Sequence, residues 1–267
     1  MSRRKLITMM DNATKNLPAN KKFLVDVMSA IERYSAQTSR KPSVWYKPSS
    51  FTCMRGMYFT RTSAPTDLQT TDYQSVGMAD TGTRRHEAIQ EVLLHIKELG
   101  YDWEYVDVET YVKKKQKFGK CKTLVIKGKD GAETKLFDTA LKVSFRCDGI
   151  IRRISTDEYF LFEFKNQVSF KYADKVCVDE AHVDQVTCYC TLLDLDKAFV
   201  LYENRDTCTL ECPEIFEVTD KMKQELCIDK IMTCEGYVER MIAPPMTDNK
   251  KNCRWCPYKT ICRKVGP

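Results

Sequence analysis

The segment Phe160-Leu-Phe-Glu-Phe-Lys-Asn166 places a carboxylate and an ammonium group two residues apart in an otherwise apolar run. In a β-strand, alternate side chains point to opposite faces, so Glu163 and Lys165 share one face with Leu161. Buried charges are costly unless they pair or bind a metal. A structural ion pair is the simpler explanation of an isolated Glu-x-Lys, because the motif is short and common.

Asp148 lies fifteen residues upstream of Glu163, on the strand that we expect to precede it in a hairpin. A short meander brings the two carboxylates together, and two carboxylates with water suit Mg²⁺ or Mn²⁺. His86 lies on an apolar helical face, which is more typical of a core histidine. As an imidazole it also completes a site of two carboxylates and favours Mn²⁺. With Lys165 polarising a phosphate or positioning the attacking water, the set predicts metal-assisted phosphodiester hydrolysis.

Two further features each have two explanations. Gln185 and Tyr189 lie four residues apart on one face of the next predicted helix, where they support the site or form a polar edge. Residues 113–129 carry eight lysines, which bind phosphates or cover an ordinary solvated loop. The candidate DNA contacts are Lys113, Lys114, Lys115 and Arg55.

The tail Cys253-Arg-Trp-Cys256-Pro-Tyr-Lys-Thr-Ile-Cys262 has the cysteine spacing of a soft metal centre. The sequence has 13 cysteines, no secretory signal and no apolar run of membrane-spanning length, so we expect a reducing cytoplasmic compartment. Cys53, in a short predicted helix, is the natural fourth ligand. The thiols alone do not distinguish Zn²⁺ from an iron–sulfur cluster, since both need four thiolates.

The elements that must position these residues alternate between helices and strands. The net charge of +6 permits a nucleic-acid partner without requiring one. Mixed strands and helices predict an α/β fold with a mixed central sheet flanked by helices, plus a helical region around the cysteines. Helices are expected at 20–35, 83–99, 178–193 and 220–241, and strands at 103–112, 141–146, 150–154, 159–165, 198–202 and 215–218, with the lysine run as a loop.

Together these motifs resemble the RecB-like iron–sulfur nucleases of the PD-(D/E)XK class, which include the CRISPR-associated Cas-four-type exonucleases and the AddB nuclease domain. The resemblance covers roughly residues 50–262. The motifs appear in the order Cys53, His86, Asp148, Glu163-x-Lys165, Gln185-x₃-Tyr189 and Cys253-x₂-Cys256-x₅-Cys262.

The resemblance implies a restriction-endonuclease-like core at residues 51–267, after a helical extension at 1–50. It implies a [4Fe–4S] cluster on Cys53, Cys253, Cys256 and Cys262. His86, Asp148 and Glu163 would bind Mg²⁺ or Mn²⁺, Lys165 would be the catalytic lysine, and Gln185 and Tyr189 would support the site and contact DNA. Two departures are Cys147, where a proline is usual, and Asn166, where a small hydroxyl residue is common.

The leading hypothesis is a stand-alone exonuclease that digests single-stranded DNA from an end, with 5′→3′ polarity by family resemblance. Proteins of a recombination, repair or CRISPR-adaptation complex are possible partners, in a bacterial cytoplasm or, for a phage-encoded protein, in the infected host. The alternatives are a structure-specific or nicking endonuclease, a non-catalytic DNA-binding or assembly subunit, and a Cys₄ zinc protein.

Overall fold

The structure is a computed structural model that describes residues 17–37, 43–67, 72–130, 133–172, 175–248, 253 and 256–266. The chain divides into two compact units, which are considered separately: a smaller one of residues 1–41 and 68–83, and a larger one of residues 42–67 and 84–267. All candidate site residues belong to the larger unit. The first sixteen residues of the expected N-terminal extension lie outside the described residues.

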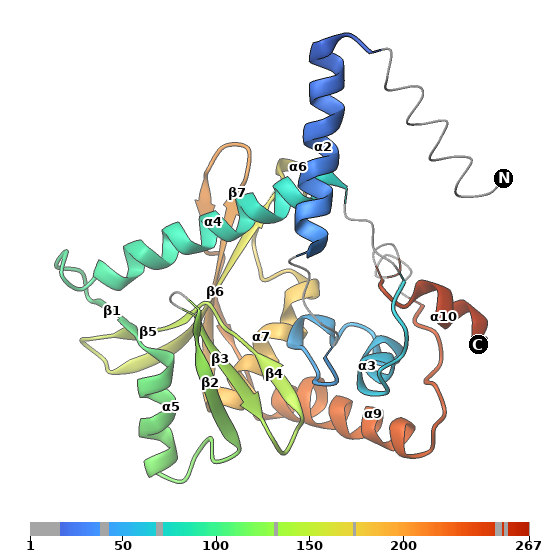
Figure 1. The fold of residues 1–267 in the computed structure, drawn as a ribbon. Coiled ribbons are helices and arrows are strands. Elements are labelled where there is room, and N and C mark those ends of the chain that lie inside the picture. The colour runs from blue at the N-terminus through green and yellow to red at the C-terminus, as the bar shows by residue number, and fades with distance from the viewer. Residues whose placement is uncertain are drawn as a thin grey trace. The chain divides into compact units, whose positions relative to one another are not determined.

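The larger unit is built on a mixed β-sheet (Figure 1). Among the described residues, six strands form this sheet in the order β1-β5-β6-β7-β8, with β9 also pairing with β7. β6 and β7 run parallel, and the other pairs are antiparallel. The strands are β1 Trp103–Val106, β5 Gly149–Arg153, β6 Glu158–Gln167, β7 Lys197–Asn204, β8 Leu210–Glu211 and β9 Ile215–Glu217.

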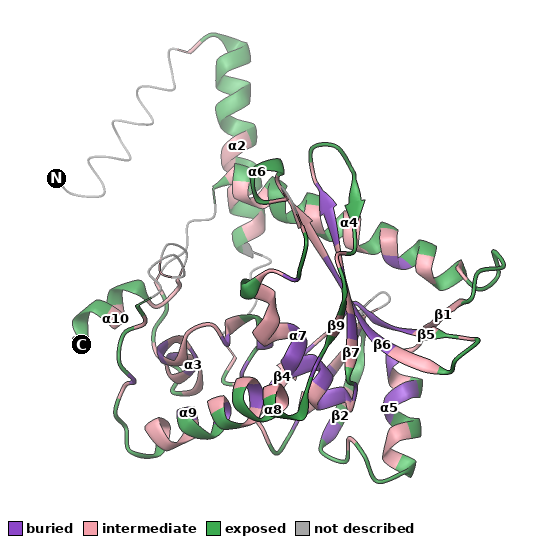
Figure 2. Cartoon of the chain, turned by 180° about the vertical axis from the view of Figure 1, so that it is seen from behind, coloured by how far each residue is buried: buried purple, intermediate pink, exposed green. Residues whose placement is uncertain are grey.

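Helices cover both faces of this sheet, because β6 and its neighbours bury apolar side chains on each side. One face packs Leu161 into the main core with Val186 of α7. The other face packs Phe162 and Phe164 against Ile89 of α4. Figure 2 shows the deep burial of α7 beside the sheet. The helices are α4 Tyr73–His95, of which residues 84–95 belong to this unit, and α7 Glu180–Leu193. The expected α/β fold with a mixed central sheet flanked by helices is confirmed.

A second sheet holds β2 Leu124–Asp130, β3 Glu133–Asp138 and β4 Val143–Phe145, all antiparallel. The expected meander from 141–146 through 150–154 to 159–165 is therefore wrong in its first step, since the first of these strands pairs with β3. The second step is right, because β5 and β6 form a hairpin.

The predicted strand at 103–112 ends at Val106, and helix α5 Val108–Lys117 follows. Asp107 ends the strand because its side chain caps the new helix, accepting a hydrogen bond from Thr110 N at 2.8 Å. The lysine run is therefore a loop only in its middle, at residues 118–123: it starts on α5 and ends on β2.

The cysteine-bearing segments are joined to α9 Asp229–Glu239 and to each other. α3 Met54–Arg61 contacts α9 through Arg61 Nε, which donates to Glu235 Oε1 at 2.8 Å. α10 Lys259–Lys264 follows the tail cysteines, and Tyr258 before it has its hydroxyl 3.1 Å from Thr60 Oγ1 of α3. The shorter elements are η1 Pro48–Ser50, α6 Ser169–Tyr172, α8 Asp220–Met222 and the π-helical turn η2 Lys223–Ile228.

The smaller unit contains α2 Ala19–Gln37, which confirms the helix predicted at 20–35. Its large apolar side chains are exposed, including Phe23, Leu24 and Tyr34. No helix of the described residues is long and apolar enough to span a membrane.

Candidate active site and cysteine centre

Strand β6 places Glu163 and Lys165 on one face, as the alternation of side chains predicts. Glu163 and Lys165 lie in register with Val200 and Tyr202 of the parallel neighbour β7. Glu163 is buried, with 3% of its surface exposed. Lys165 Nζ donates to Glu163 Oε1 at 2.6 Å, so the charged pair expected from the sequence is formed.

Asp148 stands just before β5 and reaches β6 through its side chain. The Phe164 amide donates to Asp148 Oδ2 at 2.7 Å, which fixes the carboxylate beside Glu163. The Asp148 carbonyl accepts from Gln90 Nε2 at 2.8 Å and from the Tyr105 hydroxyl at 2.9 Å. These contacts hold the backbone and the side chain of Asp148 at once.

Gly149 allows the tyrosine to approach so closely. A Cβ atom at this position would lie 2.4 Å from Tyr105 Cε2, well inside van der Waals contact. Gly149 pairs with Phe162 of β6, the strand that carries Glu163, so a side chain at this position would displace the Tyr105 ring next to this pair of strands.

His86 of α4 reaches Asp148 from the other face of the sheet. Its Nδ1 lies 3.2 Å from Asp148 Oδ1, and its ring packs edge-on against Phe164 with centroids 4.9 Å apart. Burial disfavours the charged imidazole, but the hydrogen bond and charge of Asp148 outweigh it and raise the pKa of His86. The three predicted metal ligands thus form one chain of neighbours.

Gln185 of α7 links the lysine and the glutamate. Its Oε1 accepts from Lys165 Nζ at 3.0 Å, and its Nε2 donates to Glu163 Oε1 and to the Tyr189 hydroxyl, each at 3.0 Å. Tyr189 is buried and stacks on Phe145. Both residues therefore support the acidic site, as expected. Because Tyr189 is buried, it supports Gln185 from inside the protein and is not exposed for contact with DNA.

The buried carboxyl group of Glu163 is only partly hydrogen-bonded. Burial and the nearby charge of Asp148 raise the pKa of Glu163 to about 7, although Lys165 works in the opposite direction. Its second oxygen, Oε2, is buried and has no hydrogen-bond partner among the described residues. A buried carboxylate oxygen without a partner is costly, and a cation would satisfy it.

Two neighbours of the site escaped the sequence analysis. Burial and the charge of Asp148 raise the pKa of Glu133 of β3, so a further carboxylate lies near Asp148. His182 of α7 lies on the Lys165 side, and burial followed by the Lys165 charge lowers the pKa of His182 to about 4. His182 precedes Gln185 by three residues, a helical spacing that pointed to a shared face.

Asn166, one of the two departures from the resemblance, has a structural role. Its Nδ2 donates to Glu203 Oε2 at 2.6 Å, and Arg85 Nε lies 3.0 Å from the same oxygen. Arg85 directly precedes His86 on α4. The amide of Asn166 therefore helps to hold the helix that carries His86.

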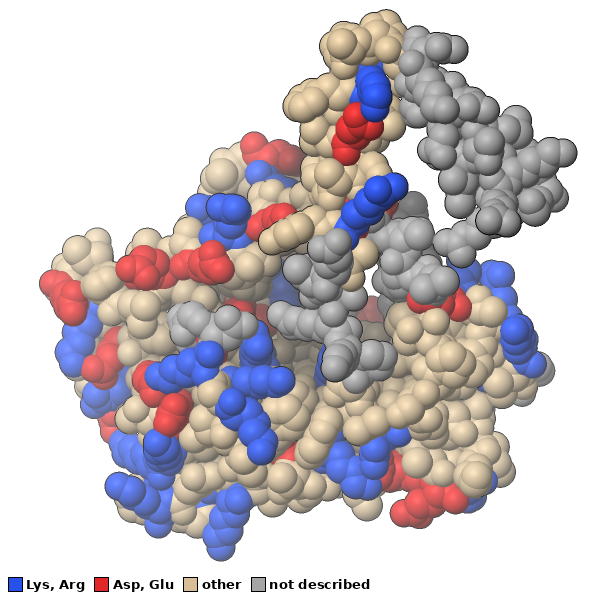
Figure 3. Space-filling model, viewed as in Figure 1, with Lys and Arg blue, Asp and Glu red and all other residues tan. Residues whose placement is uncertain are grey.

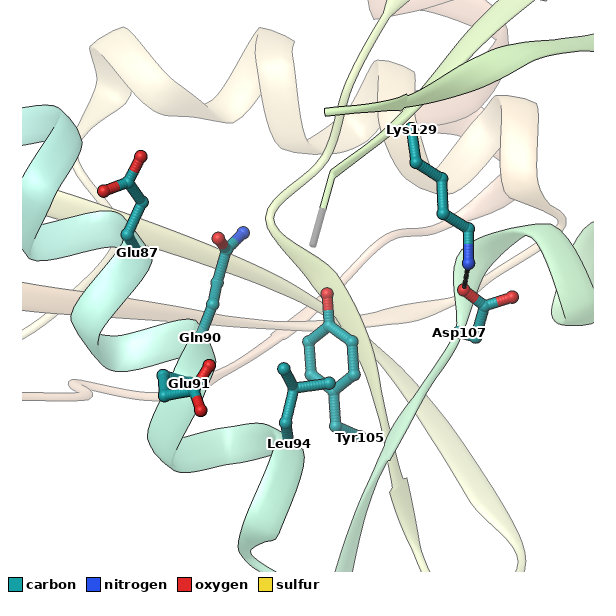
Figure 4. Close-up of a pocket in the computed structure, with 7 residues that line it drawn as sticks. All are labelled: Glu87, Gln90, Glu91, Leu94, Tyr105, Asp107 and Lys129. Carbon is teal, nitrogen blue, oxygen red and sulfur yellow. Dashed lines mark hydrogen bonds and ion pairs between the residues drawn. The ribbon is translucent and has the colours of Figure 1, made fainter. Parts of the chain in front are cut away.

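A cleft of about 470 Å³ adjoins the Asp148 backbone (Figure 4). Gln90 and Tyr105, which hold the Asp148 carbonyl, are part of its wall. The other lining residues are Glu87, Glu91, Leu94, Asp107 and Lys129. Lys129 is paired with Asp107, so the cleft wall is acidic and suits cations better than phosphates.

The four predicted cluster cysteines lie near one another. Burial raises the pKa of Cys256, and the charges of Cys53, Cys253 and Cys262 raise it further. Cys53 caps α3 and accepts from Gly56 N at 3.4 Å. The tail is fixed near α3 by Asp67, whose amide donates to the Pro257 carbonyl at 2.7 Å. Segments two hundred residues apart thus meet where the sequence predicts a shared centre.

Within the part of the chain that the structure describes, no group of three or more His, Cys, Asp or Glu side chains is arranged to hold a metal ion. Neither the acidic residues nor the cysteines therefore have ligand geometry as they stand. The donor types nevertheless fit: oxygen ligands with a free buried acceptor at one site, and four thiols at the other.

The four candidate DNA contacts differ in their surroundings. Lys113 pairs with Glu109 and Lys115 with Asp194, while Lys114 lies over the Tyr159 ring. Lysines and arginines gather over α5 and the neighbouring hairpin in the view of Figure 3. Lys117, Lys122 and Lys127 in this region are exposed and without an ion pair to any described residue. Arg55 is buried, so its guanidinium is not on a surface that DNA can reach.

Comparisons with known proteins add little to this geometry. No protein-family model matches the chain, and no curated protein matches it. Among solved structures, the crystal structure of SSO0001 matches with a TM-score of 0.46 and 17% sequence identity, over 94% of this chain and 98% of that chain. A likeness at this level carries no argument about function.

Proposed function

We propose that the protein is a metal-dependent deoxyribonuclease with a restriction-endonuclease-like core, acting as an exonuclease on DNA ends. The observation that carries this proposal is the buried Glu163 Oε2, which has no hydrogen-bond partner in the described part of the chain. It lies beside Asp148, and Lys165 donates to the other oxygen. A purely structural ion pair has no need of a second carboxylate and a free buried acceptor. The preferred substrate is single-stranded DNA with 5′→3′ polarity, as the family resemblance implies.

The residues that would hold Mg²⁺ or Mn²⁺ are Asp148, Glu163 and His86. When bound there, the cation would supply charge neutralisation at the phosphate and a water of lowered pKa. His86 must be neutral to act as a ligand, whereas Asp148 raises its pKa, so cation and proton compete for this imidazole.

Lys165 has one donor to spare for the substrate. An ammonium group has three N–H donors, and Glu163 and Gln185 accept two of them. The third is free to donate to a phosphate oxygen or to the attacking water. Gln185 and Tyr189 keep the ammonium group in position, because rotation of Lys165 would break the hydrogen bond to Gln185.

The four cysteines would hold a [4Fe–4S] cluster that ties α3 to the tail. Phosphodiester hydrolysis transfers no electron, so we assign the cluster a structural role. Four thiols from segments far apart in the sequence fit this role, because a shared centre closes a long loop and metal binding becomes folding free energy. Zn²⁺ in the same four-thiolate site is the alternative, and the absorption spectrum of protein purified without air separates the two.

The test compares Lys165→Met with Lys197→Met on end-labelled single- and double-stranded DNA with Mg²⁺ or Mn²⁺. Lys197 is the matched control, since it pairs with the partly exposed Glu158 of the same strand β6 at 2.7 Å. Loss of one preorganised electrostatic group lowers the rate by about a hundredfold or more, so Lys165→Met should be inactive. Lys197→Met should cleave like wild type.

Wild-type cleavage by Lys165→Met would overturn the nuclease proposal. Covalently closed circular DNA decides the mode of action: an exonuclease leaves it intact, and a nicking or structure-specific endonuclease cuts it.

A further inference from the structure

Arg55 is a buried guanidinium that forms no ion pair with any residue that the structure describes. It lies on α3, two residues after Cys53, and 2% of its surface is exposed. Its Nη2 donates to the Gly266 carbonyl at 2.5 Å. Its Nε and Nη1 are buried and have no hydrogen-bond partner among the described residues. Arginine stays protonated in proteins, so a full positive charge and three N–H donors on two nitrogen atoms have no partner among the described residues.

The same helix shows that carboxylates are within reach of its other arginine. Arg61 pairs with Glu235 at 2.8 Å, whereas no described carboxylate pairs with Arg55. Phe59 lies 5.9 Å from the guanidinium carbon, a contact that does not satisfy the N–H groups. A buried arginine without an ion pair destabilises the fold unless another negatively charged group lies beside it.

The neighbouring thiols supply a negative charge once they bind a metal. Four thiolates around a core of charge +2 leave a net charge of −2, for Zn²⁺ and for an oxidised [4Fe–4S] cluster alike. Arg55 lies in the first turn of α3, which Cys53 caps, so it is two residues from one of the four thiols. Arg55 Nη2 also anchors Gly266, two residues after the end of α10, which carries Cys262.

We propose that Arg55 is the buried counter-charge of the four-cysteine centre, with Nε and Nη1 as the donors reserved for its thiolates. This inference rests on the four-cysteine centre of the proposed function, but not on nuclease activity. Arg55 is then a positioning residue that retains the metal, and the two buried charges compensate each other. It also explains why a basic residue predicted to contact DNA is inside the protein.

The experiment uses the full chain purified without air, as wild type, Arg55→Met, Arg55→Lys and the control Arg61→Met. Iron, sulfide and zinc are measured per chain, followed by the rate at which a chelator removes the metal at fixed pH and salt. Residues that support metal ligands typically contribute ten- to a hundredfold to affinity, so Arg55→Met should lose metal roughly tenfold faster or more. Arg55→Lys keeps the charge and should be intermediate, and Arg61→Met should match wild type.

A reduction potential separates charge compensation from simple anchoring of the tail. Without a nearby positive charge, an iron centre accepts an electron less readily, so Arg55→Met should have a lower potential than wild type and Arg61→Met an unchanged one. If Arg55→Met is insoluble, Arg55→Gln replaces it in both measurements. For a zinc centre, the rate of metal loss alone decides.

Equal metal loss in Arg55→Met and wild type, with an equal potential where iron is present, would limit Arg55 to holding Gly266 and overturn the proposal. Wild-type protein with neither iron nor zinc would remove the four-cysteine centre and this inference with it. The DNA cleavage assay on the same sample then shows separately whether the nuclease proposal survives.

Discussion

The acidic site around Glu163 and the four cysteines lie in the same compact unit, yet their side chains are held by different means. At the acidic site, hydrogen bonds from α4, β1, β6 and α7 fix nearly every polar atom, and one carboxylate oxygen is left over. Among the cysteines, hydrogen bonds fix the surrounding backbone. The thiols repel one another as thiolates, and no described carboxylate pairs with the buried Arg55.

The two regions therefore differ in what a bound ligand would contribute. Hydrogen bonds hold the acidic side chains without a cation, so a bound cation would add chemistry to a structure that already stands. In our proposal, the charges of the four thiolates and of Arg55 balance only when a metal is bound, so there the ligand would be part of the fold. Losing the metal should therefore loosen the cysteine centre and leave the hydrogen bonds of the acidic site in place.

The largest expected effect comes from removing a cysteine ligand. Cys53→Ala should contain little iron, unfold at lower temperature and be poorly soluble, and activity should be lost through misfolding. Cys121→Ala is the control, because Cys121 lies outside the centre, with its thiol 3.5 Å from the Leu192 carbonyl. Its iron content should equal that of wild type. Equal iron in Cys53→Ala and wild type would assign the fourth ligand elsewhere, with Cys227 and Cys234 as the next candidates.

A methyl group at Gly149 tests the rigidity of the acidic site. Gly149→Ala should lower the free energy of unfolding by ~2 kcal/mol or more, because the new Cβ meets the Tyr105 ring. Gly236→Ala is the matched control in helix α9, where a Cβ meets nothing within 4 Å. It should stabilise the protein by roughly 0.5–1 kcal/mol. Denaturant unfolding of both variants decides, and an unaffected Gly149→Ala would show a loosely held Asp148.

The sequence predicted the acidic site better than its support. Alternation in β6 placed Glu163 and Lys165 on one face, and helical spacing placed Gln185 beside Tyr189, because both depend on local geometry. The side chains that donate to the Asp148 carbonyl are Gln90 of α4 and Tyr105 of β1. No local sequence pattern relates these two elements to the β5–β6 hairpin.

The fold was predicted where periodicity was strong and missed where polar residues are buried. β3 escaped because its inward positions include Thr134 and Asp138, so its alternation is not an apolar one. The strand at 103–112 was extended too far because the capping signal of Asp107 and Thr110 was not read. Spacing in the tail predicted that its cysteines lie together, but the burial of Arg55 depends on packing that spacing does not encode.

We expect an effect of intermediate size on the pH dependence of the free energy of unfolding, caused by His182 beside the acidic site. The folded pKa of His182 is about 4, below its ordinary value of 6.5. A lowered pKa means that the stability contribution is complete above pH 6.5 and is lost as the pH falls through 4. His182→Asn, whose amide can still accept from Tyr202, should remove roughly 3 kcal/mol of pH dependence across this window.

His95→Asn is the control for this measurement. His95 is exposed, and its pKa is raised by hydrogen bonds to Glu98 and Glu91, so its contribution has the opposite sign and is lost as the pH rises. Urea unfolding at pH 4, 5, 6 and 7 gives the two profiles. A His182→Asn profile parallel to wild type would mean that His182 is not held neutral by its surroundings.

The smallest expected effect concerns the lysines. Neutralising Lys113, Lys114 and Lys115 should flatten the salt dependence of DNA binding by less than one unit of slope per lysine, because two of them already pair with carboxylates. Changing the unpaired Lys117, Lys122 and Lys127 to glutamine should flatten it by roughly one unit for each phosphate that is no longer neutralised. Unchanged slopes in both triple variants would identify this surface as ordinary solvated charge.

The most direct test of the central claim is Mn²⁺ binding to wild type, Glu163→Gln and Glu158→Gln, followed by the paramagnetic resonance of the free ion. Glu158 lies on the same strand with an exposed ion pair to Lys197, so its variant controls for the loss of one carboxylate. If Glu163 Oε2 is the acceptor reserved for a cation, wild type and Glu158→Gln bind one Mn²⁺ with similar affinity, and Glu163→Gln binds it at least tenfold more weakly. Equal binding by Glu163→Gln and wild type would contradict the account.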